Sequence, residues 1–233
     1  MSFYNQASDT QGLQGVINNA QSITWERRKI TGQTMSRGGR TRISSIASAV
    51  PWSFTIKPRP RMVYSQMRSL IESLDTIDMT TPTTINIGLT NTNLSYVTQY
   101  QGAWTTSQLA AMTFTSQSGL NFTMDVSSVT GKNVGDIVFE KGDFIQPKAA
   151  PGDSYRYPYT VTDTVTWSAG NTLIVPVHRP FIIDPDGDPF NRILTIGSDV
   201  TWSVVLTSKP SYRISGFDVL DFTDDFRCIE VIE

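Results

Sequence analysis

Residues 50–88 constrain the fold most, because they set the one clear helix signal of the chain between two strand signals. Apolar and polar residues alternate from 52 to 57, which is the pattern of a half-buried strand. Pro58 and Pro60 then end that strand, since neither can donate to a ladder, and the fixed backbone angle of Pro60 suits the start of a helix.

An amphipathic helix is predicted over about 61–75. Its apolar residues recur at spacings of three and four along one stripe: Val63, Met67, Leu70, Ile71 and Leu74. A second strand is predicted over 83–89, with Ile85 and Ile87 on one face. No other stretch has a clear helix pattern. The sequence therefore predicts one helix packed on a β-framework.

The remainder of the chain favours β-structure. Its 233 residues are rich in Ser, Thr, Asn and Gln, and short apolar runs alternate with Gly and Pro, as in sandwiches and barrels. From residue 119 onward the strand signals become short and regularly spaced, which predicts a small barrel or meander. Residues 1–20 are interpreted as an arm or a short helix that docks on another surface, with a neighbouring subunit as one candidate.

Charge is segregated along the chain. Residues 27–68 hold ten Lys or Arg and no acid, whereas residues 182–233 hold ten acids and four bases. Two interpretations stay open: two solvated faces of one monomer, or opposite patches that meet head to tail between subunits and close a ring. The interface candidates are Arg37, Arg40 and Arg42, in an exposed glycine-rich loop or hairpin tip, and Asp221, Asp224 and Asp225.

The charge distribution indicates no partner other than protein. The pI is acidic and no nucleic-acid-binding signature accompanies the bases, so no direct sequence-specific binding of nucleic acid is expected. No apolar run is long enough to span a bilayer, and the N-terminus lacks the basic-then-apolar arrangement of a signal peptide, so we expect a soluble protein with no membrane partner.

Candidates for catalysis are few. His178 is the single histidine, and no G-x-S-x-G elbow is present, so His178 is interpreted as a structural, hydrogen-bonded residue. Cys228 is the single cysteine and is interpreted as a buried thiol, and one His with one Cys cannot supply a zinc site. We expect no catalytic residues and no cofactor.

One acidic turn is a weak candidate for a metal site. Asp184, Asp186 and Asp188 alternate on a short loop, where their carboxylates can converge on a hard cation. The spacing departs from that of calcium loops, because Gly187 comes at the fourth position and Thr195 stands at the twelfth. A solvated β-turn explains the same residues, and we expect no bound metal.

The order of several motifs resembles a family of tailed-bacteriophage tail-tip proteins, the distal tail or baseplate-hub type. The resemblance covers roughly residues 37–212. Its motifs are an arginine and glycine loop at Arg37 to Arg40, a helix leading to a strand that ends in Gly88, a glycine-led strand over 119–126, a corner at Gly142, Asp143, Phe144, Ile145 and Gln146, a strand with Tyr159, Val161 and Val165, and Arg179 with Pro180 before the acidic turn.

This resemblance implies a structural virion protein that is not an enzyme. It implies a tail-tube-like β-domain with one flanking helix, formed by residues 21–118 and 184–233, an inserted small β-barrel over 119–183, and an N-terminal arm over 1–20. Six copies are expected to form a ring at the tail tip that joins the tail tube to the baseplate hub. Its partners would be itself and other tail tube and baseplate proteins, with localisation in the virion and, during assembly, the host cytoplasm.

Two other functions remain open on the sequence. A carbohydrate-binding adhesin module would use aromatic residues, and the candidates are Tyr96, Tyr100, Trp104, Tyr155 and Tyr157, although such residues belong more often to a core. A tail-associated glycosidase would need two carboxylates, and nothing in the sequence singles out a pair.

Overall fold

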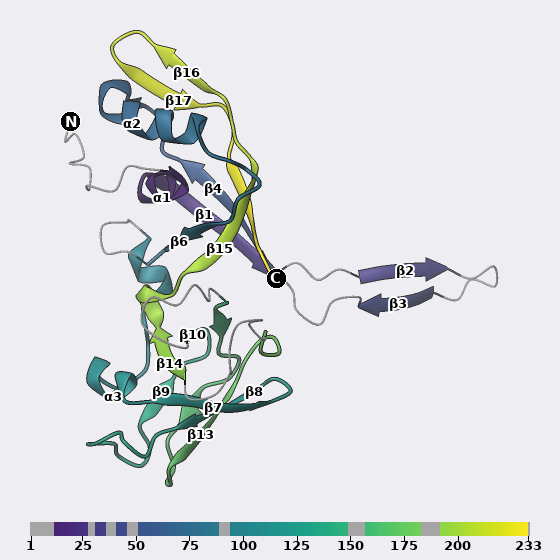
Figure 1. The fold of residues 1–233 in the computed structure, drawn as a ribbon, viewed down its shortest axis with the longest axis vertical. Coiled ribbons are helices and arrows are strands. Elements are labelled where there is room, and N and C mark those ends of the chain that lie inside the picture. The colour runs from purple at the N-terminus through teal and green to yellow at the C-terminus, as the bar shows by residue number, and fades with distance from the viewer. Residues whose placement is uncertain are drawn as a thin grey trace.

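The computed structural model describes residues 12–27, 31–35, 41–45, 51–88, 94–148, 157–182 and 192–232. The protein is mainly β, as predicted, with several separate sheets and three α-helices in the described ranges. Figure 1 shows a five-stranded sheet with two of the helices, a six-stranded sheet beside one end of it, and a two-stranded hairpin that stands apart from both.

The first sheet is antiparallel throughout and forms the upper half of Figure 1. Its strands, in spatial order, are β1 (Ala20–Arg27), β4 (Trp52–Pro58), β18 (Phe226–Glu230), β15 (Trp202–Ser208) and β6 (Thr83–Ile85). The predicted alternation holds in β4, where Trp52, Phe54 and Ile56 are buried. Burying these side chains on one face is the main stabilising term for such a strand.

Three α-helices are described: the predicted flanking helix, one in the segment interpreted as an arm or a short helix, and one that was not predicted. The predicted one is α2 (Tyr64–Asp75), which begins after β5 (Met62–Val63) and buries its apolar stripe in the core of the first sheet. The arm contains α1 (Gly12–Asn18), which buries Leu13, Val16 and Ile17 in that core. The unpredicted α3 (Thr106–Ala110) is short and depends on a capping box formed by Thr105 and Gln108.

The second sheet lies below the first in Figure 1 and takes its strands from the middle of the chain. Its strands, in spatial order, are β11 (Tyr159–Thr160), β10 (Phe144–Lys148), β14 (Arg192–Ile196), β7 (Thr113–Ser118), β8 (Asn121–Asp125) and β13 (Thr172–Pro176).

Within the described residues the second sheet is not a closed barrel, which corrects the prediction of a small barrel. The described parts of its edge strands are joined by one isolated bridge, between Val161 and Val177, and share no continuous ladder. The physical reason is the length of β11, which at two residues is too short to extend the pairing along β13.

Smaller ladders complete the fold. They are β9 (Ile137–Phe139) with β12 (Val165–Thr166), β16 (Tyr212–Ser215) with β17 (Val219–Phe222) and β5, and β2 (Thr31–Met35) with β3 (Thr41–Ser45). Two 3₁₀ turns, η1 (Ser95–Thr98) and η2 (Gly197–Asp199), lie at the two connections between the sheets. The β2–β3 ladder confirms the hairpin predicted for the glycine-rich segment.

The described residues form two hydrophobic cores. One is built on the first sheet with α1 and α2, and the other on the second sheet, with members between Trp104 and Ile182. The second sheet includes β7 and β14, whose residues lie outside 119–183. The proposed division into domains remains a prediction.

Candidate functional site

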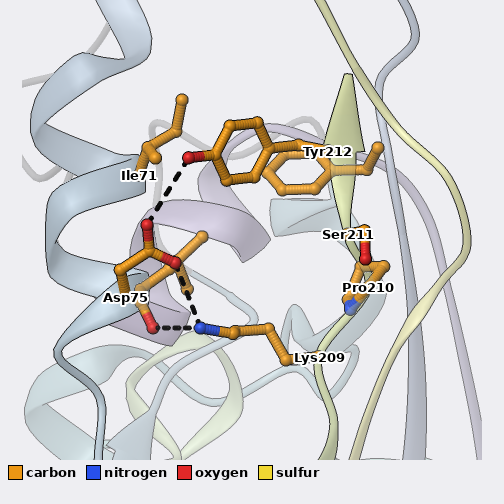
Figure 2. Close-up of a pocket in the computed structure, with 8 residues that line it drawn as sticks. Ile71, Asp75, Lys209, Pro210, Ser211 and Tyr212 are labelled. Atoms are coloured by element: carbon orange, nitrogen blue, oxygen red, sulfur yellow. Dashed lines mark hydrogen bonds and ion pairs between the residues drawn. The ribbon is translucent and has the colours of Figure 1, made fainter. Parts of the chain in front are cut away.

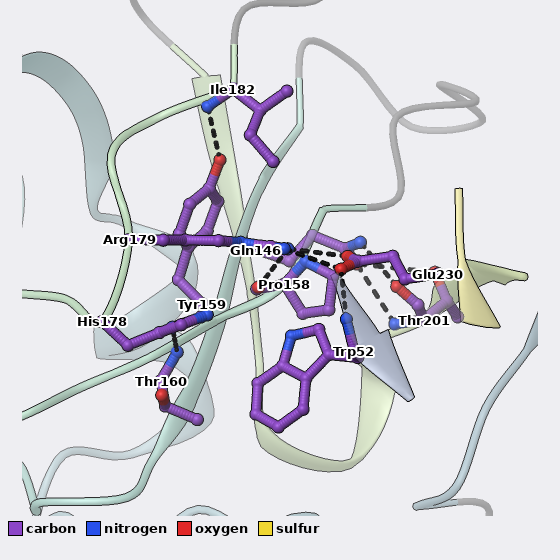
Figure 3. A network of polar contacts seen from close by, with 10 residues as sticks. All are labelled: Trp52, Gln146, Pro158, Tyr159, Thr160, His178, Arg179, Ile182, Thr201 and Glu230. Atoms are coloured by element: carbon purple, nitrogen blue, oxygen red, sulfur yellow. Dashed lines mark hydrogen bonds and ion pairs between the residues drawn. The ribbon is translucent and has the colours of Figure 1, made fainter. Parts of the chain in front are cut away.

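A buried ion pair joins the two cores. Arg179, after β13, donates to both carboxylate oxygens of Glu230 on β18 at 2.6 Å each, and both side chains are almost fully excluded from solvent. Arg179 also donates to the carbonyl of Pro158 at 2.9 Å, and the backbone N–H of Trp52 donates to Glu230 at 3.0 Å (Figure 3). Burial raises the pKa of Glu230, and the guanidinium of Arg179 opposes that rise.

The corner at residues 142–146 supplies a second connection. The side-chain amide of Gln146 is fully buried and donates to the carbonyl of Thr201 at 2.8 Å, while the N–H of Thr201 donates back at 3.2 Å. Asp143 accepts from the N–H groups of Gln101 and Glu140 at 2.9 and 2.8 Å. Desolvation by burial raises the pKa of Asp143. These motif residues therefore hold backbone segments together.

An open groove of about 1050 Å³ lies between the sheets. Its walls include Trp25 and Trp52 from the first sheet and Phe144 from the second, and Arg27 and Lys141 lie among its lining residues. Arg27 places its guanidinium 5.6 Å from the ring centroid of Trp52. Trp52 and Phe144 are almost fully buried, so Trp25 is the most exposed of these three rings, and Arg27 and Lys141 give the groove positive charge.

His178 lies in the wall of this groove as a structural residue. Its Nδ1 accepts from the N–H of Thr160 at 2.9 Å, and its ring meets that of Trp52 edge on, with 5.3 Å between centroids. Burial first, and then the charges of Arg179 and Arg27, lower the pKa of His178 to about 3. The imidazole is therefore neutral at physiological pH. Among the described residues, no side-chain hydroxyl, thiol or carboxylate forms a hydrogen bond with it.

The acidic interface candidates lie together at one end of the first sheet. Asp221, Asp224 and Asp225 line a depression of about 360 Å³ with Lys57 and Arg59. One carboxylate oxygen of Asp221 accepts from the N–H of Arg61 at 2.6 Å.

The strand register places the hairpin at the opposite end of the sheet from these acids. Phe226, which follows Asp225, pairs with Ile56 near the end of β4, whereas Arg27, from which the chain leaves for β2, pairs with Trp52 at the start of β4. Arg42 lies on β3, paired with Thr34. Arg37 and Arg40 lie outside the described residues.

The candidate metal residues Asp184, Asp186 and Asp188 also lie outside the described residues. Within the described ranges, no three His, Cys, Asp or Glu side chains gather closely enough to hold a metal ion. Cys228 is buried on β18, as predicted, and burial raises the pKa of its thiol to about 12.

The aromatic residues considered for glycan binding do not form a common surface. Trp104 and Tyr157 are buried in the second core, and the hydroxyl of half-buried Tyr100 donates to the carbonyl of Val138 at 2.5 Å. Tyr96 is 67% exposed, and Tyr155 lies outside the described residues. The prediction that such residues belong to a core is confirmed for Trp104 and Tyr157.

A smaller pocket of about 260 Å³ lies between α2 and the β15–β16 connection (Figure 2). Lys209 donates to the carbonyl of Leu74 at 3.0 Å and pairs with Asp75 at 3.2 Å. A cation at this position stabilises the carbonyl end of a helix. The contacts explain how the β15–β16 connection is held against α2.

The sequence did not predict the ion pair between Arg179 and Glu230 or the groove between the sheets. Nothing local marks Glu230 as the partner of Arg179, because the two residues are 51 positions apart. The available signal was the set of polar motif residues Asp143, Gln146 and Arg179 within apolar strand patterns, since a buried polar side chain requires a partner.

Comparison with protein-family models and with curated protein sequences found no match. No helix in the described ranges combines the length and the apolar character needed to cross a bilayer.

Proposed function

We propose that the chain is a non-enzymatic structural subunit of a bacteriophage tail tip. Copies of it assemble head to tail into a ring, with six members as the working number, and the ring joins the tail tube to the baseplate hub in the virion. The proposal takes its biological setting from the motif resemblance and its mode of assembly from the distribution of charge in the fold.

The observation that carries the proposal is that three clustered acids and the basic hairpin lie at opposite ends of one sheet, with Lys57 and Arg59 also at the acidic end. The acids Asp221, Asp224 and Asp225 lie beside the start of β18, and the basic hairpin leaves the sheet beside the end of β18. Strand β18 has five residues, which corresponds to about 17 Å. The β2–β3 ladder also extends away from the sheets (Figure 1). A second copy can bring acids to this hairpin, and repetition of that contact closes a ring.

The motif residues give independent support for a structural role. Gln146 and Arg179 are buried and connect segments of the two cores, and buried Asp143 holds two segments beside the second core together. Such contacts fix the orientation of one sheet on the other, as a ring under mechanical force requires.

The experiment is assembly of the purified protein at low and high salt, measured by light scattering and by electron microscopy. We expect rings of the wild type at low salt. The triple change Arg37→Ser, Arg40→Ser and Arg42→Ser is expected to weaken assembly, more at low salt than at high, because salt screens the attraction in both proteins. Its melting temperature is expected to stay close to that of the wild type, since exposed pairs contribute only about 0–1 kcal/mol each.

A control removes an exposed charge elsewhere. Arg68, on α2, is exposed and lines neither the acidic depression nor the groove, and replacing it with Ser should leave assembly unchanged. A wild-type protein that stays monomeric at high concentration and low salt would refute the ring. Release of reducing sugar from cell-wall or capsular polysaccharide would refute the non-enzymatic assignment.

A further inference from the structure

The tip of the β16–β17 hairpin carries an apolar side chain that touches nothing. Phe217 is 103% exposed, the highest value among the large hydrophobic residues of the described chain. An aromatic ring held fully in water gains none of the burial that stabilises aromatic residues elsewhere in the fold. Neighbouring Ile214, on edge strand β16, is 49% exposed.

The backbone at this tip is also unfavourable for the residues that occupy it. Phe217 and Asp218 have φ values of 64° and 62°, in the left-handed region that glycine and asparagine adopt most readily. Bulky side chains are rare there, and a strained conformation persists only where other contacts enforce it.

The enforcing contacts come from the beginning of α2. The carboxylate of Asp218 accepts from the N–H of Ser65 at 3.0 Å and from its hydroxyl at 2.5 Å, and the carbonyl of Asp218 accepts from the N–H of Tyr64 at 3.0 Å. Asp218 thereby caps a helix whose own N-cap residue, Val63, supplies no side-chain hydrogen bond. Asp218 is therefore fixed by the fold, and the adjoining Phe217 is presented outward in a defined position.

We propose that Phe217 is the anchor of a subunit contact and inserts into the aromatic groove of a second copy of this chain. The inference rests on the proposed ring and names the surfaces that form it. The groove, at about 1050 Å³, is far larger than one aromatic side chain, and its partly exposed apolar lining is formed by Trp25, Val97 and Leu120, next to the buried rings of Trp52 and Phe144. Buried aromatic anchors in such pockets dominate the energy of protein interfaces.

Charge and position both favour a second copy as the occupant. The β16–β17 hairpin carries two acids, Asp218 and Asp221, against one base, Arg213, while Arg27 and Lys141 at the groove outnumber the single acid there, Glu26. The groove lies at the Arg27 end of β1, beside the start of β4. The tip belongs to the hairpin whose strand β17 pairs with β5, and β5 follows the other end of β4. The tip of one copy therefore cannot enter its own groove, so the contact is head to tail.

The first test is the change Phe217→Asn. Asparagine tolerates the left-handed backbone and lacks the ring, so we expect a melting temperature equal to or above that of the wild type and a loss of association affinity of at least about 30-fold by sedimentation or light scattering. The control is Val134→Asn. Val134 lies between β8 and β9 and is 72% exposed, and this variant should associate normally.

The second test identifies the occupant. The photoreactive analogue p-benzoylphenylalanine at position 217 keeps an aromatic ring, and its cross-links in the assembled protein can be mapped by mass spectrometry. We expect cross-links between copies to segments 25–27, 141–144 and 160–162, and none to these segments from the same analogue at position 134, which is exposed and lies outside the groove lining.

The outcomes separate this inference from the proposed function. Normal assembly of the Phe217→Asn protein, its failure to fold, or cross-links between copies outside the groove would each overturn the anchor while leaving the ring in place. A wild-type protein that never associates would overturn both.

Discussion

At the scale of single residues, His178 shows how strongly the fold controls ionisation. Its ring is packed against Trp52, accepts one backbone hydrogen bond and lies near Arg179 and Arg27. Burial first, and then the charges of Arg179 and Arg27, disfavour the imidazolium, so the pKa falls from 6.5 to about 3. Because the unfolded chain keeps an ordinary histidine, protonation favours unfolding.

This linkage predicts a pH dependence of stability. Between pH 6.5 and 3 the unfolded state binds more protons than the folded state, so the contribution of His178 is complete above pH 6.5 and is lost as the pH falls. We expect this residue to lower the free energy of unfolding by about 2 kcal/mol between pH 7.5 and 5. Urea titrations at both pH values measure it.

The control is the His178→Asn protein, whose side-chain oxygen can accept from Thr160. Because His178 is the single histidine, the difference in pH dependence between the two proteins isolates this one group. Equal slopes for the two proteins over pH 5–7.5 would show that the imidazole is not held neutral.

The identity of single residues was enough to predict part of the site. The single histidine and the single cysteine were predicted to be structural, and His178 makes a backbone hydrogen bond while Cys228 is buried. Phe217 gave no signal, because an aromatic residue beside Gly216 looks like any hydrophobic residue near a turn. Its exposure follows from the cap that Asp218 places on α2, a contact across 153 positions.

At the scale of elements, the two sheets meet where the turns η1 and η2 pack against the end of β6. Gly88 makes this approach possible, since a Cβ there would lie 2.2 Å from Oγ1 of Thr98 and 2.6 Å from Cα of Ser198. Contacts of that length with backbone atoms cannot be relieved by a side-chain rotation.

We therefore expect Gly88→Ala to lower the free energy of unfolding by about 1–3 kcal/mol, as for other overpacked sites. Thermal unfolding should show a decrease of about 2–4 °C per kcal/mol for a chain of this size. Gly216→Ala is the matched control, because a Cβ there meets nothing within 4 Å. A Gly88→Ala protein as stable as this control would mean that η2 moves away at little cost.

Elements with a strong local pattern were predictable, and the others were not. Strand β4 and helix α2 follow apolar periodicities that their burial reproduces. Helix α3 has five residues, too few for a periodic stripe, and only its capping box marks it. The open edge of the second sheet depends on how far β11 extends, which residue spacing does not determine.

At the scale of the whole molecule, the pair of Arg179 and Glu230 connects one core to the other in a region without solvent. Removing one partner leaves the other buried and unpaired, whereas removing both eliminates the unpaired charge. The two changes are therefore expected to be strongly non-additive.

We predict that Arg179→Met alone and Glu230→Met alone each lower the free energy of unfolding by about 3–5 kcal/mol, and that the double change costs much less than the sum. Urea denaturation of the four proteins gives the coupling energy. Lys209→Met serves as a control for removing a cation from a partly exposed pair, with an expected effect of at most about 1 kcal/mol. Additive losses would show that the two side chains stabilise the protein independently.

The separation of charge along the chain could be predicted from the composition of each segment. The positions of the two charged segments in the fold could not. The sequence places ten bases in residues 27–68 and ten acids in residues 182–233. Only the register of β18 against β4 shows that the acids and the departure point of the hairpin occupy opposite ends of one sheet. Strand pairing between distant segments cannot be predicted from local residue patterns.

The position of β18 also has a consequence for the order in which the protein forms during synthesis. This strand lies between β4 and β15 and pairs with both, yet the ribosome makes it after every other strand of the two sheets. The second sheet ends with β14, so it can fold while β18 is still untranslated. Until then β4 keeps an unpaired, apolar edge, the kind of surface that promotes wrong pairing. The first sheet is therefore completed last, although its earliest strand is made first.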